Sequence, residues 1–598
     1  MERKDIDKKY KWNLEAIYPT LDDFEKDYKL IETEISDLDK YEDIFLKNGK
    51  SLYNFLKKDE EIGQIIEKLY AYTNLNYDVE TKNNKAQELR GRVKNLYEEY
   101  QIKTSFVRPK LLTLDYSKID EFIKEYKNLS KYEIMLRRIY RYKEHTLEQN
   151  EEKLLSDLNK VFDRSAETYE ILTDTDIELG NIKDENGNTI KLTDSNYSIY
   201  IESKDRNVRI DAFNTLYEGY GRFKNTITST MSGNINELYA ISKIRKYKSI
   251  IDMLVFSDEV TREVYDNLVK TVDSNLDTIY KFFKMKKEIL GLEELHLYDT
   301  YVPLINIESK KYTYEEAQDI VLNALNILGE DYTSILKQGF EDGWVDVYPN
   351  DSKRSGAYSG GSYLTYPYIL LNFEGKYGDV STLAHEIGHS MHSFYTRENN
   401  DYTYGDYTIF VAEVASTVNE LLLAHYMLNI SEEKEEKLYI LDRLMSLYKA
   451  TIYRQTMFAE FEEKAFTLVE KNKVLTADLL SEEYYKLNKK YFGDNVVVDD
   501  NIRYEWLRIP HFYYNFYVYK YATGLSAATY IANRIIKGED NAVADYKKFL
   551  KSGSKLSPIE SLKLAGVDLT DPKVVKDAIN YFDNIINEFK TLIKDTNN

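Results

Sequence analysis

The sequence predicts a mostly α-helical protein with a small β element. Glycine and proline are scarce, at 24 and 8 of 598 residues, which permits long uninterrupted helices and disfavours a loop-rich β-sandwich. Apolar and aromatic residues recur at spacings of three and four along most of the chain, a pattern typical of helices with one buried face. The main strand pattern lies between Arg354 and Gly378, where glycines surround a short apolar run.

Length and charge narrow the possible classes of function. A chain of 598 residues is longer than one ordinary domain, and 43% hydrophobic residues can fill a large core. The 102 acidic and 81 basic residues give a net charge of −21, which argues against a nucleic-acid partner because no basic surface is evident. Cysteine is absent, so disulfides, thiolate catalysis and cysteine-bound metals are excluded.

No targeting segment or membrane span is visible in the sequence. Residues Met1–Tyr10 have no apolar run behind their charges. The most apolar stretches, such as Glu420–Ile430, are too short and too interrupted to cross a bilayer. We therefore expect a cytoplasmic protein without a membrane partner, and no pattern indicates its oligomeric state.

The first third of the chain is predicted to be helical up to about Leu179. Its apolar faces are illustrated by the residues Leu52, Phe55, Leu56, Ile62, Ile65, Ile66 and Leu69. Asn186-Gly187, flanked by apolar residues, predicts a hairpin turn, and Ser203 is a candidate N-cap where helices resume. This interval suggests a boundary between an N-terminal helical region, 1–190, and a second region, 191–598.

The composition of the sequence changes after Gly343. Glycines cluster at positions 356, 360, 361, 375 and 378, and the apolar run Tyr368–Phe373 inside this cluster predicts a strand. Long helices are predicted from Asp379 almost to the end, with Asp379 or Ser381 as the cap of the first. That first helix carries a cluster of histidines, so we expect the functional site there.

Three of the seven histidines, His385, His389 and His392, fall within eight residues, and the first two form a His-Glu-x-x-His motif. On a helix, residues four apart share a face, with Cβ atoms about 5–6 Å apart, so both imidazoles can reach one Zn²⁺ at about 2.0–2.1 Å. Glu386 points beside such a metal, where a base acting on a metal-bound water is needed. The alternative is a pair of surface or core histidines.

A catalytic zinc site needs a third protein ligand. His392 is excluded, because seven residues of helix separate it from His385 by roughly 10.5 Å along the axis. A carboxylate on a later helix is expected instead, and the candidates are Glu398, Asp401, Asp406, Glu413 and Glu420. We choose Glu413, because a carboxylate in the apolar helix Phe410–Ser416 is costly unless it is paired or metal-bound. Glu420 lies two turns farther on the same face and is a candidate to support a ligand.

A second group of polar aromatic residues lies far downstream, where His511 is followed by Tyr514, Tyr517 and Tyr521 at spacings of three and four. Such residues can pack in a core, which is the commoner role in a chain with 55 tyrosines. Their hydroxyl and imidazole groups can also donate hydrogen bonds to an oxyanion in a water-poor cleft.

Together these motifs resemble the oligoendopeptidase F group of thimet-oligopeptidase-like zinc metallopeptidases. The resemblance covers nearly the whole chain and rests on the segments His385–His392, Phe410–Ser416 with Glu420, His511–Tyr521, Arg354–Gly361 and Ser203–Arg209. It implies a mostly helical fold with two lobes around a deep substrate channel and a small β element next to the zinc-binding helix. Residues 191–598 would form the catalytic region.

The resemblance also implies the roles of individual residues. One Zn²⁺ per chain would be held by His385, His389 and Glu413, with Glu386 as the general base. The residues that bind the substrate and its oxyanion would be His511, Tyr514 and Tyr521. Assignment among the tyrosines at 514, 517, 519 and 521 stays open.

We therefore expect a zinc-dependent endopeptidase that cleaves internal bonds of short peptides with a metal-activated water. The strand Tyr368–Phe373 could hold an extended peptide through main-chain hydrogen bonds, or it could be a buried sheet element without substrate contact. Two other functions stay open, a zinc exopeptidase that docks a substrate terminus and a non-catalytic peptide-binding protein. Glu386 argues against the second, because a binding protein needs no base.

Overall fold

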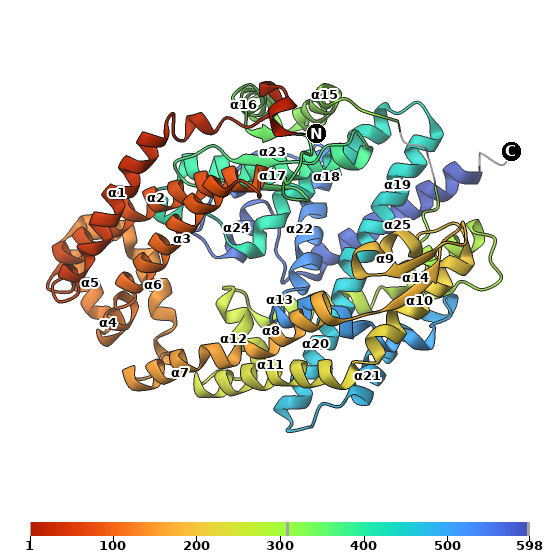
Figure 1. Cartoon of the computed structure of the whole chain (residues 1–598), viewed down its shortest axis with the longest axis horizontal. Coiled ribbons are helices and arrows are strands. Elements are labelled where there is room, and N and C mark those ends of the chain that lie inside the picture. Colours follow the sequence, from red (N-terminus) through yellow and green to blue (C-terminus); the bar gives the residue numbers. More distant parts are fainter. Residues whose placement is uncertain (1, 306–309, 595–598) are drawn as a thin grey trace. The chain divides into compact units, whose positions relative to one another are not determined.

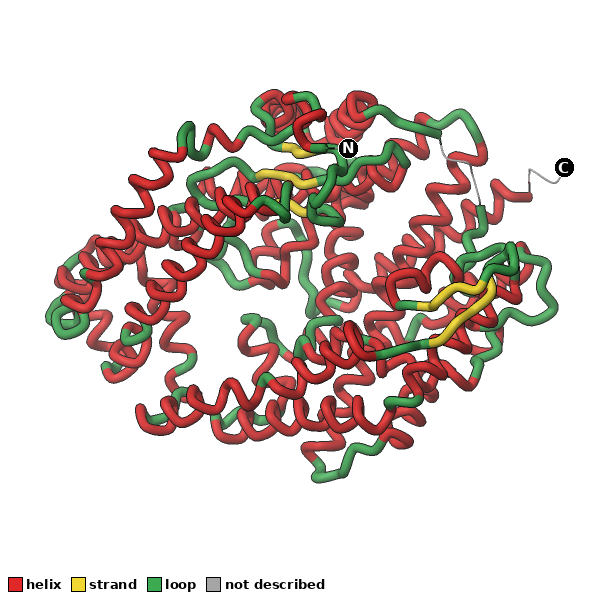
Figure 2. The backbone as a smooth tube through the Cα atoms, viewed as in Figure 1, coloured by secondary structure: helices red, strands yellow, loops and turns green. Residues whose placement is uncertain are grey.

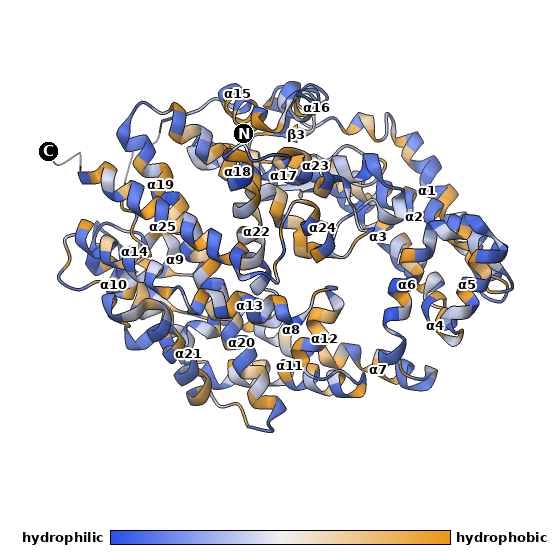
Figure 3. Ribbon diagram, turned by 180° about the vertical axis from the view of Figure 1, so that it is seen from behind, coloured by the Kyte–Doolittle hydropathy of each residue, from blue (hydrophilic) through white to orange (hydrophobic). Residues whose placement is uncertain are grey.

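The computed structural model of the chain describes residues 2–305 and 310–594. Within them helices dominate, and strands are confined to two short sheets, as the sequence predicts (Figure 1, Figure 2). Figure 3 shows hydrophilic and hydrophobic residues mixed along the helices, as expected for helices that bury one face. None of the described helices combines the length and the apolar character that crossing a membrane requires.

The described residues divide into two compact units, and each unit is assembled from three separate stretches of the chain. Unit 1 contains residues 2–146, 310–426 and 531–566. Unit 2 contains residues 147–305, 427–530 and 567–594. The division into sequence regions 1–190 and 191–598 stays a prediction.

Unit 1 is built around helices from all three of its stretches. They are α1 (Leu21–Ser36), α2 (Gly49–Val79), α3 (Asn84–Thr104), α4 (Val107–Thr113), α5 (Tyr116–Glu125), α6 (Glu133–Arg141), α15 (Tyr314–Leu325), α16 (Glu330–Glu341), α17 (Tyr377–Asn399), most of α18 (Ile409–Ile430), α23 (Ala542–Lys551) and α24 (Pro558–Leu564).

Unit 2 is likewise helical and also contains the β-hairpin. Its helices are α7 (Gln149–Phe162), α8 (Arg164–Ile171), α9 (Asp194–Ile201), α10 (Arg206–Gly221), α11 (Lys224–Ile244), α12 (Ile250–Ser257), α13 (Arg262–Asp273), α14 (Leu276–Ile289), α19 (Lys434–Tyr448), α20 (Arg454–Glu470), α21 (Ala477–Phe492), most of α22 (Tyr519–Ile536) and α25 (Pro572–Lys594).

Helix α2 confirms the helical reading of the first third of the chain. Asn48 caps it, since its side-chain oxygen accepts a hydrogen bond from the backbone N–H of Ser51 at 2.9 Å. The predicted apolar face is buried, with Phe55 and Leu69 fully enclosed in the core of unit 1. Burying one such side chain stabilises the fold by about 1.5–3 kcal/mol, so this face anchors the helix.

A three-stranded sheet in unit 1 contains the predicted strand. Strand β5 (Tyr368–Leu370) lies in the middle, parallel to β3 (Val345–Asp346) and antiparallel to β4 (Tyr358–Gly360). Because both edges of β5 are already paired and its side chains are buried, the suggestion that it holds a peptide is wrong. The two edge strands are β3 and β4, each of which pairs with β5 alone among the described residues.

The predicted hairpin is confirmed in unit 2. Strands β1 (Gly180–Lys183) and β2 (Thr189–Leu192) pair antiparallel, and Gly187 takes a φ of +80° in the turn. The cap predicted at Ser203 is wrong. A short helix, α9, intervenes first, and α10 is capped by Asp205, whose side chain accepts a hydrogen bond from the backbone N–H of Asn207 at 2.8 Å.

Candidate active site

Helix α17 carries the His-Glu-x-x-His motif, and an acidic residue in its first turn fixes its start. The Asp379 carboxylate accepts hydrogen bonds from the backbone N–H groups of Glu374 (3.0 Å) and Lys376 (2.9 Å). It thereby satisfies N–H groups that precede the helix. Neither predicted cap is right, because the N-cap is Lys376 and both Asp379 and Ser381 lie inside the helix, where Ser381 donates to Glu420 at 3.2 Å.

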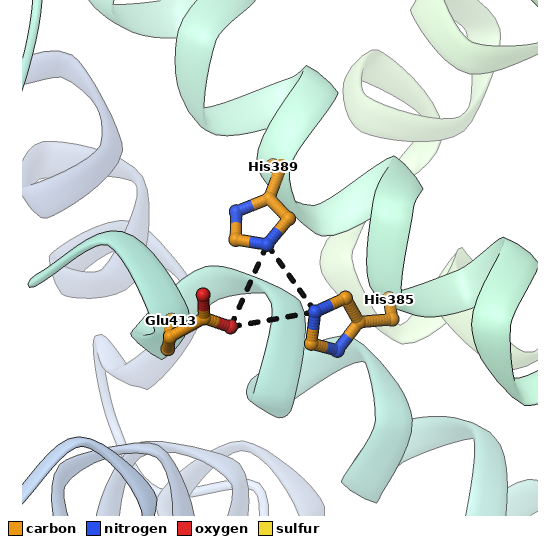
Figure 4. A group of neighbouring side chains, drawn as sticks. All are labelled: His385, His389 and Glu413. Carbon is orange, nitrogen blue, oxygen red and sulfur yellow. Dashed lines mark hydrogen bonds and ion pairs between the residues drawn. The ribbon is translucent and has the colours of Figure 1, made fainter. Parts of the chain in front are cut away.

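Three side chains from two helices converge on one point (Figure 4). His385 and His389 lie one turn apart on α17, and their Nε2 atoms are 3.2 Å apart. Glu413, in the first turns of α18, places Oε2 at 3.3 Å from Nε2 of His385 and 3.6 Å from Nε2 of His389. Among the described residues, this is the group of histidine and acidic side chains whose spacing suits a metal ion.

The spacing of these three atoms fits a tetrahedral cation. Tetrahedral ligands at about 2.0–2.1 Å from Zn²⁺ stand about 3.3 Å from one another, close to the three separations observed. Two imidazole nitrogens and one carboxylate oxygen are also the ligands of a catalytic zinc site. The donor set and its geometry therefore fit this metal.

The electrostatics of the group favour a positive charge at the same point. Burial alone would lower the pKa of His385, but hydrogen bonds to Glu413 and Glu420 raise it to about 10. Burial alone would raise the pKa of Glu413, but hydrogen bonds from the two histidines hold it well below its usual range. Both shifts have the same cause, which is the attraction between the imidazoles and the carboxylates, and this arrangement favours a positive charge between them.

Gly388 allows α17 and α18 to approach closely enough to share the group. A Cβ atom at this position would lie 2.4 Å from Cα of Ser416 and 2.6 Å from the carbonyl oxygen of Ala415. Asn419 of α18 reinforces the contact by donating to the carbonyl oxygen of Ala384 at 3.2 Å. The backbone separation that brings Glu413 to the histidines therefore depends on a residue without a side chain.

Glu420 contacts His385, as its position on α18 suggests. Its Oε2 lies 3.1 Å from Nδ1 of His385, so it fixes which imidazole nitrogen faces the group. Of the other carboxylates considered as the third ligand, Glu398 is exposed at the end of α17 and Asp406 is exposed in the turn before α18. The structure brings Glu413 to the histidines, and its role as a ligand is taken up below.

Glu386 is 6% exposed, and its Oε2 has no hydrogen-bond partner among the described residues. Burial raises the pKa of this carboxyl above its usual range; His385 and His389 act in the opposite direction, and the charges of Glu413 and Glu420 act in the same direction as burial. An unpartnered buried carboxylate is costly, so Glu386 is a candidate functional group.

His392 serves the packing of α17. Its ring is fully buried and stacks on Tyr407 at 3.7 Å with an angle of 3° between the planes, while Phe549 of α23 closes another side. The Tyr407 hydroxyl lies 3.1 Å from that of Ser393. Sequence reasoning missed Tyr407, because nothing in its local pattern reveals a partner fifteen residues away.

The downstream aromatic group lies in unit 2. His511 Nε2 is 3.3 Å from the Tyr521 hydroxyl, and the rings of His511 and Tyr514 lie 5.2 Å apart. Tyr514 is 51% exposed, so it is not a core residue, whereas Tyr519 is fully buried and its hydroxyl donates to Asp258.

The suggestion that Tyr514, Tyr517 and Tyr521 form one helical stripe is wrong. Asn515 and Phe516 have φ values of 56° and 64°, and α22 begins only at Tyr519. The bend therefore separates Tyr514 from the helix. The roles of His511, Tyr514 and Tyr521 toward a substrate stay predictions.

Comparisons with known proteins identify the family. The sequence model of peptidase family M3 matches residues 199–581, and a model described as oligopeptidase F matches residues 110–178. The chain is 41% identical over 592 residues to oligopeptidase PepF of Bacillus subtilis, a match that covers 99% of this chain and 88% of that protein.

Two solved structures are similar along almost the entire chain. One, from Chlamydophila abortus, superimposes with a TM-score of 0.92 at 34% identity and covers 99% of both chains. The other, oligoendopeptidase-F from Enterococcus faecium, has a TM-score of 0.74 at 32% identity and covers 96% of this chain and 99% of its own. These matches confirm the resemblance drawn from the motifs: the chain belongs to peptidase family M3 and, within it, to the oligoendopeptidase F group.

Proposed function

We propose that this protein is a zinc-dependent endopeptidase that hydrolyses internal bonds of short peptides. The observation that carries the proposal is the convergence of His385, His389 and Glu413 beside the buried carboxylate of Glu386. Membership of family M3 supports the proposal, since M3 peptidases are metallopeptidases and use a divalent metal. The preference for short peptides is supported by the names of the relatives, an oligopeptidase and an oligoendopeptidase.

We assign His385, His389 and Glu413 as the residues that hold one Zn²⁺, with Glu420 orienting His385. Zinc, when bound, supplies a Lewis acid that polarises the scissile carbonyl and lowers the pKa of water at the site. Glu386 removes the proton of the attacking water and passes it to the leaving amine. Its unpartnered oxygen and its raised pKa suit a group that must both accept and release a proton.

Strand β4 is the element that can hold an extended peptide. The Ser359 hydroxyl lies 2.8 Å from that of Ser390, the residue after His389, so β4 passes beside the helix that carries the motif. A peptide added to its free edge would gain main-chain hydrogen bonds whatever its side chains. This suits a peptidase of broad specificity.

His511, Tyr514 and Tyr521 are assigned to binding the substrate and its oxyanion. If the Tyr521 hydroxyl donates to the oxyanion, Tyr521→Phe should lower kcat by about 10²–10³. An unchanged kcat together with a lower melting temperature would show instead that Tyr521 only packs in unit 2.

The function is tested by digestion of a ladder of peptides, from five to forty residues, and of one folded protein, with the products read by mass spectrometry. Internal cuts confined to the short members, and abolished by a chelator, are expected. Stepwise removal of terminal residues would replace the endopeptidase with an exopeptidase. Zinc-loaded, folded protein that cuts nothing would contradict the peptidase function.

A further inference from the structure

A cavity of about 510 Å³ lies in unit 1, apart from the three residues that hold the metal. One wall is α2, which contributes Asp59, Glu60 and Glu67. The opposite residues are Gly361, directly after β4, and Arg397, on the last turns of α17. Its size suits part of a peptide, and Arg397 in its wall belongs to α17, the helix that carries His385 and His389.

The walls of the cavity carry more negative than positive charge. Glu60 is compensated, because Lys131 donates to both of its oxygens at 2.9–3.0 Å. The carboxylates of Asp59, Glu67 and Asp406 form no ion pair with any residue that the structure describes, and Arg397 is the remaining cation in the wall. Burial raises the pKa of Asp59 and of Glu67, and with all three carboxylates ionised the excess of two negative charges favours a cationic ligand.

Tyrosine hydroxyls hold two of these carboxylates in fixed positions. Tyr100 donates to Asp59 and Tyr402 donates to Glu67, both at 2.7 Å. A single phenol leaves the other lone pairs of each carboxylate available to a further donor. The cavity is therefore preorganised for a ligand that donates hydrogen bonds and carries positive charge.

Arg397 adds a second, independent sign of a ligand. Its Nη1 atom is buried and has no hydrogen-bond partner among residues 2–305 and 310–594. Burial lowers the pKa of this guanidinium, and the charges of Asp406 and Glu67 act in the opposite direction, so the three groups share one neighbourhood. A buried, unpaired N–H donor beside carboxylates suits a ligand that has both an ammonium group and a carbonyl oxygen.

We propose that this cavity binds the ammonium group of a peptide substrate through Glu67 and Asp406, while Arg397 donates to a nearby peptide carbonyl. The proposal rests on the peptidase function proposed above. A peptide paired antiparallel to β4 would enter the cavity with its amino-terminal side, because β4 runs toward Gly361. The ammonium group is thus the amino terminus or a lysine side chain close to it.

Helix α17 gives the distance from Arg397 to the peptide bond that is cut. Arg397 follows His389 by eight residues of α17, which is about 12 Å along the helix axis. An extended peptide spans about 12 Å with three or four residues. The peptide carbonyl that Arg397 binds is therefore expected three or four residues before the scissile bond, with the ammonium group close to it.

The test measures binding in the Glu386→Gln background, so that the probe is not cut. The probe is a fluorescent ten-residue peptide without lysine, with a free or an acetylated amino terminus. Acetylation should weaken binding about tenfold, the effect of one partly exposed ion pair with hydrogen bonds. The double variant Glu67→Gln/Asp406→Asn should bind the free peptide as weakly as the acetylated one. Asp401→Asn, which removes a charge from the same turn outside the cavity, should bind like the parent.

A third probe, acetylated and carrying lysine as its first residue, distinguishes the two sources of the ammonium group. If this probe binds as tightly as the free peptide, the site accepts a lysine side chain. If it binds weakly, the site is specific for the terminal amine. Equal affinity for the free and the acetylated peptide, or an equal loss in the Asp401→Asn control, would overturn the proposal. Peptide hydrolysis by the enzyme with Glu386 intact is measured separately, so a failed subsite is distinguishable from a failed peptidase.

Discussion

Gly388 sets the distance between α17 and α18, the two helices that carry the proposed zinc ligands. Its hydrogen faces the backbone of α18, where a Cβ atom would overlap Ser416. Moving α18 outward would carry Glu413 away from His385 and His389, whose nitrogens lie only 3.3 and 3.6 Å from its oxygen. A metal site tolerates displacements of only a few tenths of an ångström, so a single methyl group at Gly388 should be felt there.

Gly388→Ala should therefore lower zinc affinity by at least about tenfold, while alanine itself is favourable within a helix. Zinc content after dialysis against a weak chelator measures the effect. Gly91→Ala is the matched control, since Gly91 lies inside α3 and a Cβ there meets nothing within 4 Å. Full zinc occupancy in the Gly388 variant would show that zinc binding does not depend on the close contact between α17 and α18.

Glu420 acts through His385 and should affect metal binding without being a ligand. Glu420→Ala removes the acceptor 3.1 Å from Nδ1 of His385 and should cost about 10–100-fold in zinc affinity. Glu413→Ala removes a ligand and should abolish stable binding. A competition titration with a chromophoric chelator ranks the two, and an equal loss in both would contradict the distinction between a ligand and its support.

At the scale of elements, the bend between His511 and α22 depends on a buried acid. The backbone N–H of Phe516, a bulky residue with a φ of 64°, donates to Glu462 of α20 at 3.0 Å. Left-handed backbone at such a residue costs about 1–2 kcal/mol and persists only where its surroundings hold it. Glu462 is 1% exposed, and burial raises its pKa from 4.5 to about 8.

The stability of unit 2 should fall as the pH rises from about 4.5 to about 8. Within this window Glu462 ionises in the unfolded chain but stays protonated in the fold, so folding is progressively penalised, by up to about 5 kcal/mol. Glu462→Gln removes the penalty and keeps the acceptor. Its melting temperature relative to the parent should therefore rise by at least about 2 °C between pH 5 and pH 8.5. Glu435→Gln, at an exposed site of α19, should show no such trend, and a pH-independent difference for Glu462→Gln would refute the buried acid.

Sequence reasoning succeeded where the signal was local and failed where it depended on distant partners. The helical face of α2, the hairpin at Gly187 and the pairing of His385 with His389 all follow from spacing within one element. Glu413 was chosen because a lone carboxylate in an apolar helix is costly, and the structure places this residue beside the two histidines. The central position of β5 was missed, because strand order depends on pairings that no single strand encodes.

At the scale of the whole molecule, each unit combines three separate stretches of chain, which no local pattern reveals. Unit 1 gathers α2 from the first stretch, the sheet with α17 and α18 from the second, and α23 from the third. The group around His385, by contrast, lies on two consecutive helices, α17 and α18. The family assignment was reachable from sequence, because its motifs are short and contiguous.

The most direct test of the proposed chemistry is the Glu386→Gln variant, measured for both zinc content and peptide turnover. Glutamine keeps the size of the side chain but cannot take a proton. We predict one zinc per chain, as in the parent, and turnover of a short peptide lowered by about 10²–10⁴. Full turnover with zinc bound would contradict Glu386 as the base, and loss of zinc would show that Glu386 helps to hold the metal.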